Sequence, residues 1–216
     1  MLYNDIIKSV EENKIIAIVR GVGKEDLLPL AEALYAGGIR LLEITYSADG
    51  RVSDTETASR IKLLADTFEG RMLIGAGTVL TEAQVELTAK AGGRFIISPD
   101  TNEAVIKKAK ELGLVSMPGA LTPSEITAAA RAGADFVKLF PVTSLGPEYI
   151  KAISAPLSHI KLLAVGGVDL DNIKEFLKAG VCGFGLGSNI IDKKLIAEGD
   201  FRSITQLARK YVEEIK

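Results

Sequence analysis

Residues 134–167 read ADFVKLFPVTSLGPEYIKAISAPLSHIKLLAVGG, and this stretch predicts the fold of the chain. Two short runs rich in Val, Leu, Ile and Phe, at 134–140 and 160–165, flank a segment with helical spacing at 146–154. A strand, a helix and a second strand in this order form a βαβ unit, in which the two strands lie parallel in one sheet. The stretch therefore predicts an α/β protein with a parallel sheet.

The same alternation continues along the chain and predicts eight strands. The predicted strands are Lys14 to Val19, Ile39 to Thr45, Arg71 to Ala76, Gly93 to Ser98, Gly113 to Met117, Ala134 to Phe140, Ile160 to Val165 and Val181 to Leu186. Helices are predicted at 24–36, 52–68, 81–91, 101–111, 122–131, 146–154, 169–179 and 200–215. Eight such units in 216 residues predict a single (β/α)8 TIM barrel over residues 1–216. The alternative, a doubly wound sheet of about five or six strands, would leave several of the apolar runs without a place.

A short extra helix is predicted before the first strand, from Tyr3 to Glu12. This stretch is amphipathic, and we expect it to close the bottom of the barrel. Function in such a barrel then lies at the opposite end, on the C-terminal ends of the strands and the loops that follow them.

The composition excludes several classes of protein. The chain is 47% hydrophobic and 25% charged, which is typical of an ordinary globular domain. Its formal net charge of −2 provides no general attraction to nucleic acid or to an anionic membrane. No run of about 18 consecutive apolar residues is present. We expect a soluble, cytoplasmic protein that binds neither nucleic acid nor a membrane, and any anionic ligand must be bound by local groups.

Cysteine and histidine each occur once, as Cys182 and His159. One cysteine cannot form an internal disulfide, and a single histidine excludes a His-pair metal site and argues against a Ser/His or Cys/His triad. We therefore expect no metal site. His159 is predicted to lie on the surface at the opposite end from the functional loops, and Cys182 to be a small core residue.

A lysine lies within the apolar strand predicted at 134–140. Because side chains alternate along a strand, Val137 and Leu139 face the helices, while Phe136, Lys138 and Phe140 face the inside of the barrel. One interpretation is a lysine that reaches solvent or forms an ion pair. The other is an amine nucleophile, whose pKa the apolar surroundings lower so that part of it is neutral at pH 7.

A carboxylate and an arginine also face inward. Glu43 lies on the inner face of the strand predicted at 39–45, either as an ion-pair partner of Lys138 or as a general acid/base. Arg20 ends the first strand on its inner face, either paired with Glu43 or free to bind a substrate carboxylate or phosphate. A carboxylate beside Lys138 would raise the pKa of the lysine, so the nucleophile needs separation from it or other cations nearby.

Two glycine-rich turns follow the last two predicted strands. They contain Gly166 and Gly167 in one turn and Gly187 and Ser188 in the other. Glycine lets backbone N–H groups approach a phosphate closely, and we expect a helix N-terminus near Ser188 to contribute. Together the two turns predict a phosphate site.

Eight short motifs spread over nearly the whole chain are similar to those of a known family. They are AIVRG (17–21), AGGIRLLEIT (36–45), IGAGTVLT (74–81), FIISPD (95–100), PGALTPSE (118–125), KLFP (138–141), AVGGV (164–168) and GLGS (185–188). With these motifs the chain resembles the class I aldolases for 2-keto-3-deoxy-6-phosphogluconate and 4-hydroxy-2-oxoglutarate. GAGTV together with KLFP is the specific part. The resemblance implies a homotrimer of (β/α)8 barrels that forms a Schiff base with pyruvate and needs no metal or other cofactor.

The resemblance also implies roles for individual residues. Lys138 matches the Schiff-base lysine and Glu43 the acid/base that handles its protons. Thr78 and Pro99 match positions that line the pyruvyl pocket, and Phe140 matches the aromatic residue beside the lysine.

The remaining matches concern the two anionic groups of the substrate. Gly166, Gly167, Gly187 and Ser188 match the phosphate site of the family. Several members carry an arginine shortly after the glutamate of the second strand, and this chain has none there. Other members have an arginine at the end of the first strand, as Arg20 is here, so we infer that Arg20 binds the substrate carboxylate.

The expected reaction is reversible cleavage of a 2-keto-3-deoxy-6-phospho sugar acid to pyruvate and glyceraldehyde 3-phosphate. The motifs at 164–168 and 146–151 are closer to the phosphogalactonate-cleaving branch. Cleavage of 4-hydroxy-2-oxoglutarate is a further expected activity. The alternatives are another phosphate-binding barrel enzyme, such as a sugar-phosphate epimerase or decarboxylase, and a non-catalytic sugar-acid-binding barrel.

Overall fold

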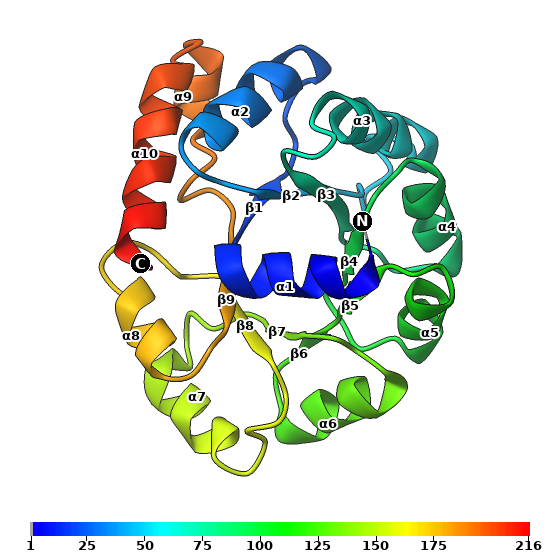
Figure 1. Cartoon of the computed structure of the whole chain (residues 1–216), viewed down its shortest axis with the longest axis vertical. Coiled ribbons are helices and arrows are strands. Elements are labelled where there is room, and N and C mark those ends of the chain that lie inside the picture. The colour runs from blue at the N-terminus through cyan, green and yellow to red at the C-terminus, as the bar shows by residue number, and fades with distance from the viewer. Residues whose placement is uncertain (1) are drawn as a thin grey trace.

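The sheet of the computed structural model, which describes residues 2–216, curls into a ring of parallel strands surrounded by helices (Figure 1). The strands follow the order β5-β4-β3-β2-β1-β9-β8-β7-β6. Their bounds are β1 Ile15–Val19, β2 Leu41–Thr45, β3 Leu73–Gly77, β4 Phe95–Ile97, β5 Val115–Met117, β6 Gly119–Ala120, β7 Val137–Leu139, β8 Leu162–Val165 and β9 Gly183–Leu186. The first and last strands of this order, β5 and β6, follow each other in the chain, so one extended segment closes the ring.

The segment that contains β5 and β6 explains why the sheet has nine strands where eight were predicted. β5 and β6 are separated only by Pro118, which has no N–H group to donate to a neighbouring strand. The carbonyl of Pro118 accepts a hydrogen bond from the N–H of Lys138 at 2.9 Å, so the segment pairs with β7 across the break. The predicted (β/α)8 barrel is confirmed, and the strand predicted to end at Met117 continues to Ala120.

The helices lie outside the ring, except α1, and most fall where the sequence predicts them. Their bounds are α1 Tyr3–Asn13, α2 Lys24–Ala36, α3 Asp54–Thr67, α4 Glu82–Lys90, α5 Glu103–Glu111, α6 Pro123–Ala132, α7 Gly146–Ser154, α8 Ile173–Lys178, α9 Lys193–Ala197 and α10 Phe201–Glu214. Helix α8 begins later than predicted because the carboxylate of Asp169 accepts hydrogen bonds from the N–H groups of Asp171 and Asn172 and forms a turn. Within residues 2–216, no helix has the length and apolar character needed to cross a membrane.

The helix expected near Ser188 is also displaced. The N–H groups of residues 190 and 191 both donate to the carbonyl of Gly187, which forms one isolated turn. Helix α9 begins only at Lys193, and the side chain of Asp192 caps its first N–H groups. The expectation that a helix N-terminus at Ser188 contributes to the phosphate site is therefore wrong.

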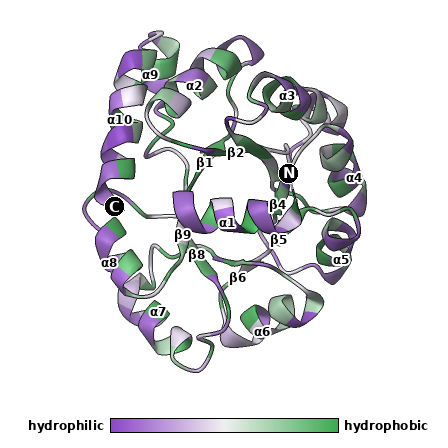
Figure 2. Ribbon diagram, in the orientation of Figure 1, coloured by the Kyte–Doolittle hydropathy of each residue, from purple (hydrophilic) through white to green (hydrophobic). Residues whose placement is uncertain are grey.

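Two apolar clusters occupy the two sides of the sheet. Val137 and Leu139 belong to the outer cluster between strands and helices, and Phe136 belongs to the inner cluster inside the barrel. Figure 2 shows many hydrophilic residues on the surrounding helices, for example α10, and hydrophobic residues on strands such as β2. The alternation predicted for Phe136, Val137 and Leu139 is thus confirmed. Phe140, predicted to face the inside of the barrel, lies beyond the end of β7 and is 40% exposed. Cys182 is half-buried against the inner cluster, and His159 is exposed as predicted.

Helix α1 lies across one end of the ring (Figure 1). Its residues Ile6 and Val10 are buried in the inner cluster. The hydroxyl of Tyr3 donates a hydrogen bond to the carboxylate of Asp135, which also accepts one from Lys110 Nζ at 3.0 Å. The predicted closure of the barrel by this helix is confirmed, and access to the interior is left at the C-terminal ends of the strands.

Ile6→Ala tests how much this closure contributes to stability. Removing most of a fully buried isoleucine side chain is expected to lower the free energy of unfolding by about 2 to 4 kcal/mol. Urea denaturation measures this, with Lys8→Ala on an exposed position of the same helix as the control. A loss equal to that of the control would show that α1 does not seal the interior.

Candidate active site

Two charged residues are buried at the C-terminal end of the ring. Lys138 on β7 is 7% exposed and Glu43 on β2 is 1% exposed. Glu43 pairs in register with Ile18 on β1 and Gly75 on β3, and Lys138 with Gly119 on β6. Burying either charge without compensation is costly, so both residues need a physical explanation.

Lys138 is not held by an ion pair. None of the ion pairs within 4.0 Å that join residues 2–216 includes its ammonium group, which lies 4.5 Å from the centre of the Phe140 ring. Burial lowers the pKa of Lys138, Glu43 opposes this shift, and the positive charge of Arg20 supports it. Neither a solvent-reaching nor an ion-paired lysine fits these observations, so the interpretation as an amine nucleophile is favoured.

Glu43 has the properties of a general acid/base. Burial raises the pKa of its carboxyl group to about 7, against the opposing effects of Lys138 and Arg20. Its Oε2 atom is buried and has no hydrogen-bond partner within residues 2–216. Near neutral pH both the protonated and the ionised form are populated, so the group can donate or accept a proton. An unsatisfied carboxylate oxygen is also free to bind a substrate atom or a water molecule.

The position of Glu43 depends on Gly77, whose importance the sequence did not reveal. A Cβ atom added to Gly77 would overlap with Oε1 of Glu43. The carboxyl group therefore occupies the space that any other residue at the end of β3 would fill. The signal in the sequence is the glycine of GAGTV, but only the structure shows which side chain lies against it.

Arg20 crosses the mouth of the barrel. Its Nη2 atom donates a hydrogen bond to Oγ1 of Thr78 at 3.0 Å, which joins the end of β1 to the turn after β3. β2 lies between these strands. Arg20 forms no ion pair with Glu43 within 4.0 Å among the described residues, so the structural pair considered for them is absent there.

Thr78 itself has an unusual backbone. Its φ angle is +56°, in the left-handed region that β-branched residues rarely adopt. Such conformations cluster at binding sites, where the surrounding structure holds them in place. The N–H group of Thr78 donates no hydrogen bond within residues 2–216 and is available to a ligand at the mouth.

The turn after β8 is fixed by hydrogen bonds from two side chains outside it. Gly166 and Gly167 both have positive φ angles, of +84° and +85°. The carbonyl of Gly166 accepts a hydrogen bond from Thr143 Oγ1 at 3.1 Å, and that of Gly167 accepts one from Asn172 Nδ2 at 2.9 Å. A Cβ atom on Gly166 would lie 3.4 Å from the ring of Phe140, so this turn borders the surroundings of Lys138.

Four backbone donors are left free in the two predicted phosphate turns. Within residues 2–216, the N–H groups of Gly166, Gly167, Gly187 and Ser188 donate no hydrogen bonds. Unused N–H groups near the ends of adjacent strands suit the binding of an anion. The structure thus retains the glycine contribution to the predicted site although the helix contribution is missing.

Two cavities open on either side of Arg20. One, of about 530 Å³, lies beside the turn after β9 and is lined by Ile18, Arg20, Gly187, Ser188, Ile191, Asp192, Lys193 and Lys194. The other, of about 540 Å³, lies between the loops that follow β1 and β2. Arg20 and Lys193 line both cavities.

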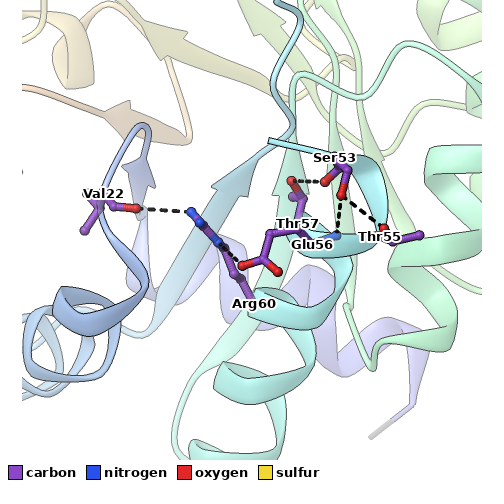
Figure 3. A network of polar contacts seen from close by, with 6 residues as sticks. All are labelled: Val22, Ser53, Thr55, Glu56, Thr57 and Arg60. Carbon is purple, nitrogen blue, oxygen red and sulfur yellow. Dashed lines mark hydrogen bonds and ion pairs between the residues drawn. The ribbon is translucent and has the colours of Figure 1, made fainter. Parts of the chain in front are cut away.

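The second cavity is bounded by a network that Figure 3 shows in detail. Arg60 of α3 donates a hydrogen bond to the carbonyl of Val22 at 3.1 Å and pairs with Glu56 at 3.1 Å. Ser53 caps the same helix by accepting a hydrogen bond from the N–H of Glu56. The charge of Arg60 is therefore engaged in joining the loop after β1 to α3.

Pro99 lies two residues after the end of β4, at the same end of the barrel. Its carbonyl packs against Gly119, which pairs in register with Lys138. The structure thus brings Lys138, Phe140 and Gly166 together, and Arg20 with Thr78. Pro99 borders the strand next to the lysine.

A buried amine with a lowered pKa, accompanied by a carboxyl group that titrates near neutral pH, defines a class of enzyme that forms covalent adducts with carbonyl compounds. The family model for KDPG and KHG aldolase matches residues 6–207. The chain belongs to this family and is an aldehyde-lyase that cleaves carbon–carbon bonds. This membership decides against an epimerase or decarboxylase barrel and against a non-catalytic binding barrel.

Individual relatives cover most of the chain. A probable 2-dehydro-3-deoxy-6-phosphogalactonate aldolase of Rhizobium meliloti is 41% identical, over 88% of this chain and 87% of the relative. A 2-dehydro-3-deoxy-phosphogluconate aldolase of Haemophilus influenzae is 33% identical, over 98% and 97%. The KDPG aldolase of Legionella pneumophila, solved with pyruvate captured as a covalent carbinolamine intermediate, has a TM-score of 0.83 and 32% identity, covering 94% of this chain and 96% of that one.

Glu43→Gln tests the buried carboxyl group through stability. Because burial raises its pKa from 4.5 to about 7, ionising Glu43 costs about 3 kcal/mol more in the folded than in the unfolded chain. The cost is absent below pH 4.5 and complete above pH 7. We expect the free energy of unfolding of the variant, relative to the unmodified protein, to increase by up to about 3 kcal/mol between pH 5 and pH 8.

Urea denaturation at the two pH values measures this difference. The exposed Glu69→Gln serves as the control and is expected to show no such gain. A difference between Glu43→Gln and the unmodified protein that stays constant from pH 5 to pH 8 would contradict the raised pKa.

Proposed function

We propose that the protein cleaves a 2-keto-3-deoxy-6-phospho sugar acid to pyruvate and glyceraldehyde 3-phosphate through a Schiff base on Lys138. The observation that carries this proposal is a lysine 7% exposed, without an ion pair among the described residues, whose pKa is lowered by burial. The carbinolamine in the Legionella pneumophila relative supports the same chemistry.

The first half of the reaction forms the adduct. Neutral Lys138 attacks the C2 carbonyl carbon, and the resulting carbinolamine loses water to give an iminium ion. Protonated Glu43 supplies the proton with which the hydroxyl leaves as water. Its pKa of about 7 makes this form available at neutral pH.

The second half breaks the carbon–carbon bond. The Glu43 carboxylate, which lost its proton in the first half, accepts the proton of the C4 hydroxyl. The C3–C4 bond then breaks, and its electron pair moves toward the iminium nitrogen. Glyceraldehyde 3-phosphate leaves, and a lysine-bound enamine remains. Glu43 then delivers a proton to C3, and water hydrolyses the iminium to release pyruvate and regenerate Lys138.

The two anionic ends of the substrate have separate binding groups in this proposal. Arg20 and the free N–H group of Thr78 bind the carboxylate, because both lie at the mouth and Arg20 is held beside Thr78 by its hydrogen bond to the Oγ1 atom of that residue. The free N–H groups of the two glycine turns bind the phosphate. The ring of Phe140 lies beside the ammonium group of Lys138, and Pro99 borders the strand next to the lysine.

The relatives are named for both the phosphogalactonate and the phosphogluconate substrate, which differ in configuration at C4. The similarity to the Rhizobium meliloti protein, named for the phosphogalactonate, supports the galactonate type for this chain. The proposal covers both. The homotrimer, the cytoplasmic location, the independence from metals and cofactors, and the cleavage of 4-hydroxy-2-oxoglutarate stay predictions.

Trapping with borohydride tests the nucleophile. Incubation with pyruvate followed by reduction is expected to attach the reduced pyruvate to Lys138, which peptide mass spectrometry identifies. Lys138→Met is the matched control and is expected to give no adduct. An active preparation that yields no adduct on Lys138 would overturn the Schiff-base mechanism.

Glu43→Gln tests the proton transfer separately. The variant keeps the shape of the side chain but cannot give up or take a proton, so exchange of the pyruvate methyl protons with deuterated water is expected to slow about 100-fold or more. Nuclear magnetic resonance follows the exchange. An exchange rate equal to that of the unmodified protein, in a variant that still forms the adduct, would remove Glu43 from its role.

A further inference from the structure

The turn after β9 lacks the source of positive charge that the sequence predicted for it. The helix expected at Ser188 begins at Lys193, and its first N–H groups are already bound by Asp192. Asp192 also lines the cavity beside Ser188. A phosphate dianion in this cavity would therefore meet a carboxylate where a free helix end was expected, and other groups must neutralise it.

Three cations line this cavity, namely Arg20, Lys193 and Lys194. Lys194 lies 4.0 Å from the carboxylate of Glu198, which partly neutralises it. Neither Arg20 nor Lys193 forms an ion pair within 4.0 Å among residues 2–216. Two cations without a counter-ion thus border one opening, an arrangement that favours an anion between or beside them.

The position of Lys193 is specific. Its Nζ atom lies 3.7 Å from the position of a Cβ atom built on Gly21, the residue after Arg20. The side chain thus extends from the start of α9 toward the end of β1. It lines the cavity that contains Gly187 and Ser188 as well as the cavity on the other side of Arg20.

We propose that Lys193 binds the phosphate group of the substrate, together with the free N–H groups of Gly187 and Ser188. The inference rests on the proposed function and deepens it, because it makes Lys193 the residue by which the enzyme distinguishes phosphorylated from unphosphorylated 2-keto acids. Arg20 remains assigned to the carboxylate, held there by its hydrogen bond to Thr78.

An ammonium group suits this task. It is a compact charge on a flexible stem, so it can follow a phosphate as the substrate enters and as the aldehyde product leaves. The N–H groups of the turn provide direction, and the lysine provides charge. The nearly neutral protein, with a formal net charge of −2, has no other general attraction for the substrate.

The variant Lys193→Gln tests this proposal. The KM for the phosphorylated sugar acid is expected to rise about tenfold, with kcat changed less than about twofold, because a charge-assisted hydrogen bond outside the reacting centre is lost. Cleavage of the same sugar acid without its phosphate, and the pyruvate concentration for half-maximal borohydride trapping, are expected to stay unchanged. Inorganic phosphate should inhibit the variant about tenfold less strongly.

Lys24→Gln is the matched control, because Lys24 is an exposed lysine at the start of α2, at the same end of the barrel, and it does not line the cavity. It is expected to change each KM less than about twofold. Three results would overturn the role of Lys193. The first is that both variants change the KM values equally, and the second is that Lys193→Gln leaves the KM for the phosphorylated substrate unchanged. The third is that Lys193→Gln raises the KM for the unphosphorylated substrate as much as that for the phosphorylated one.

The same experiment separates this role from the proposed function. If the unmodified protein forms no pyruvate adduct, the Schiff-base function fails. If the adduct forms normally in both proteins and the KM values are equal, only the assignment of Lys193 fails. The midpoint temperature of thermal unfolding is the control for folding. We expect Lys193→Gln to unfold at the same temperature as the unmodified protein, which would show that the variant keeps its fold.

Discussion

The burial of Lys138 beside Glu43, without an ion pair between them, is the constraint on which the rest of the structure depends. A direct ion pair would hold the lysine protonated, and full exposure would do the same. In the observed arrangement burial lowers the pKa of Lys138 and raises that of Glu43 to about 7. Each group therefore keeps access to the protonation state that carbonyl chemistry needs.

The barrel provides this environment because it is closed at one end and crowded within. Helix α1 places Ile6 and Val10 in the inner apolar cluster, which blocks water from below. Gly77 leaves space for the carboxyl group of Glu43, so the strands can approach without exposing it. The low polarity of the interior is thus a property of the whole ring of strands and not of one pocket.

The mouth has the opposite character. Arg20 and Lys193 carry charges that no acidic partner within 4.0 Å neutralises among the described residues, and the glycine turns leave their N–H groups unbonded. The interior and the mouth of the barrel therefore have different functions. The apolar interior adjusts the pKa of the reacting groups, while the open polar rim attracts and orients the anionic ends of the substrate.

The sequence by itself determined the ring and the inward direction of its functional residues. Apolar runs that alternate with helices predict parallel strands, and the period of two places Lys138, Glu43 and Arg20 on inner faces. The start of α9 at Lys193 was not predictable, because it depends on two separate local sets of hydrogen bonds. The carbonyl of Gly187 accepts from the N–H groups of residues 190 and 191 and forms an isolated turn, and Asp192 caps the N–H groups of Lys194 and Leu195. Only the tertiary structure decided that Glu43 lies against Gly77 and apart from any ion pair with Lys138, because distances between strands that are far apart in the chain depend on how the ring closes.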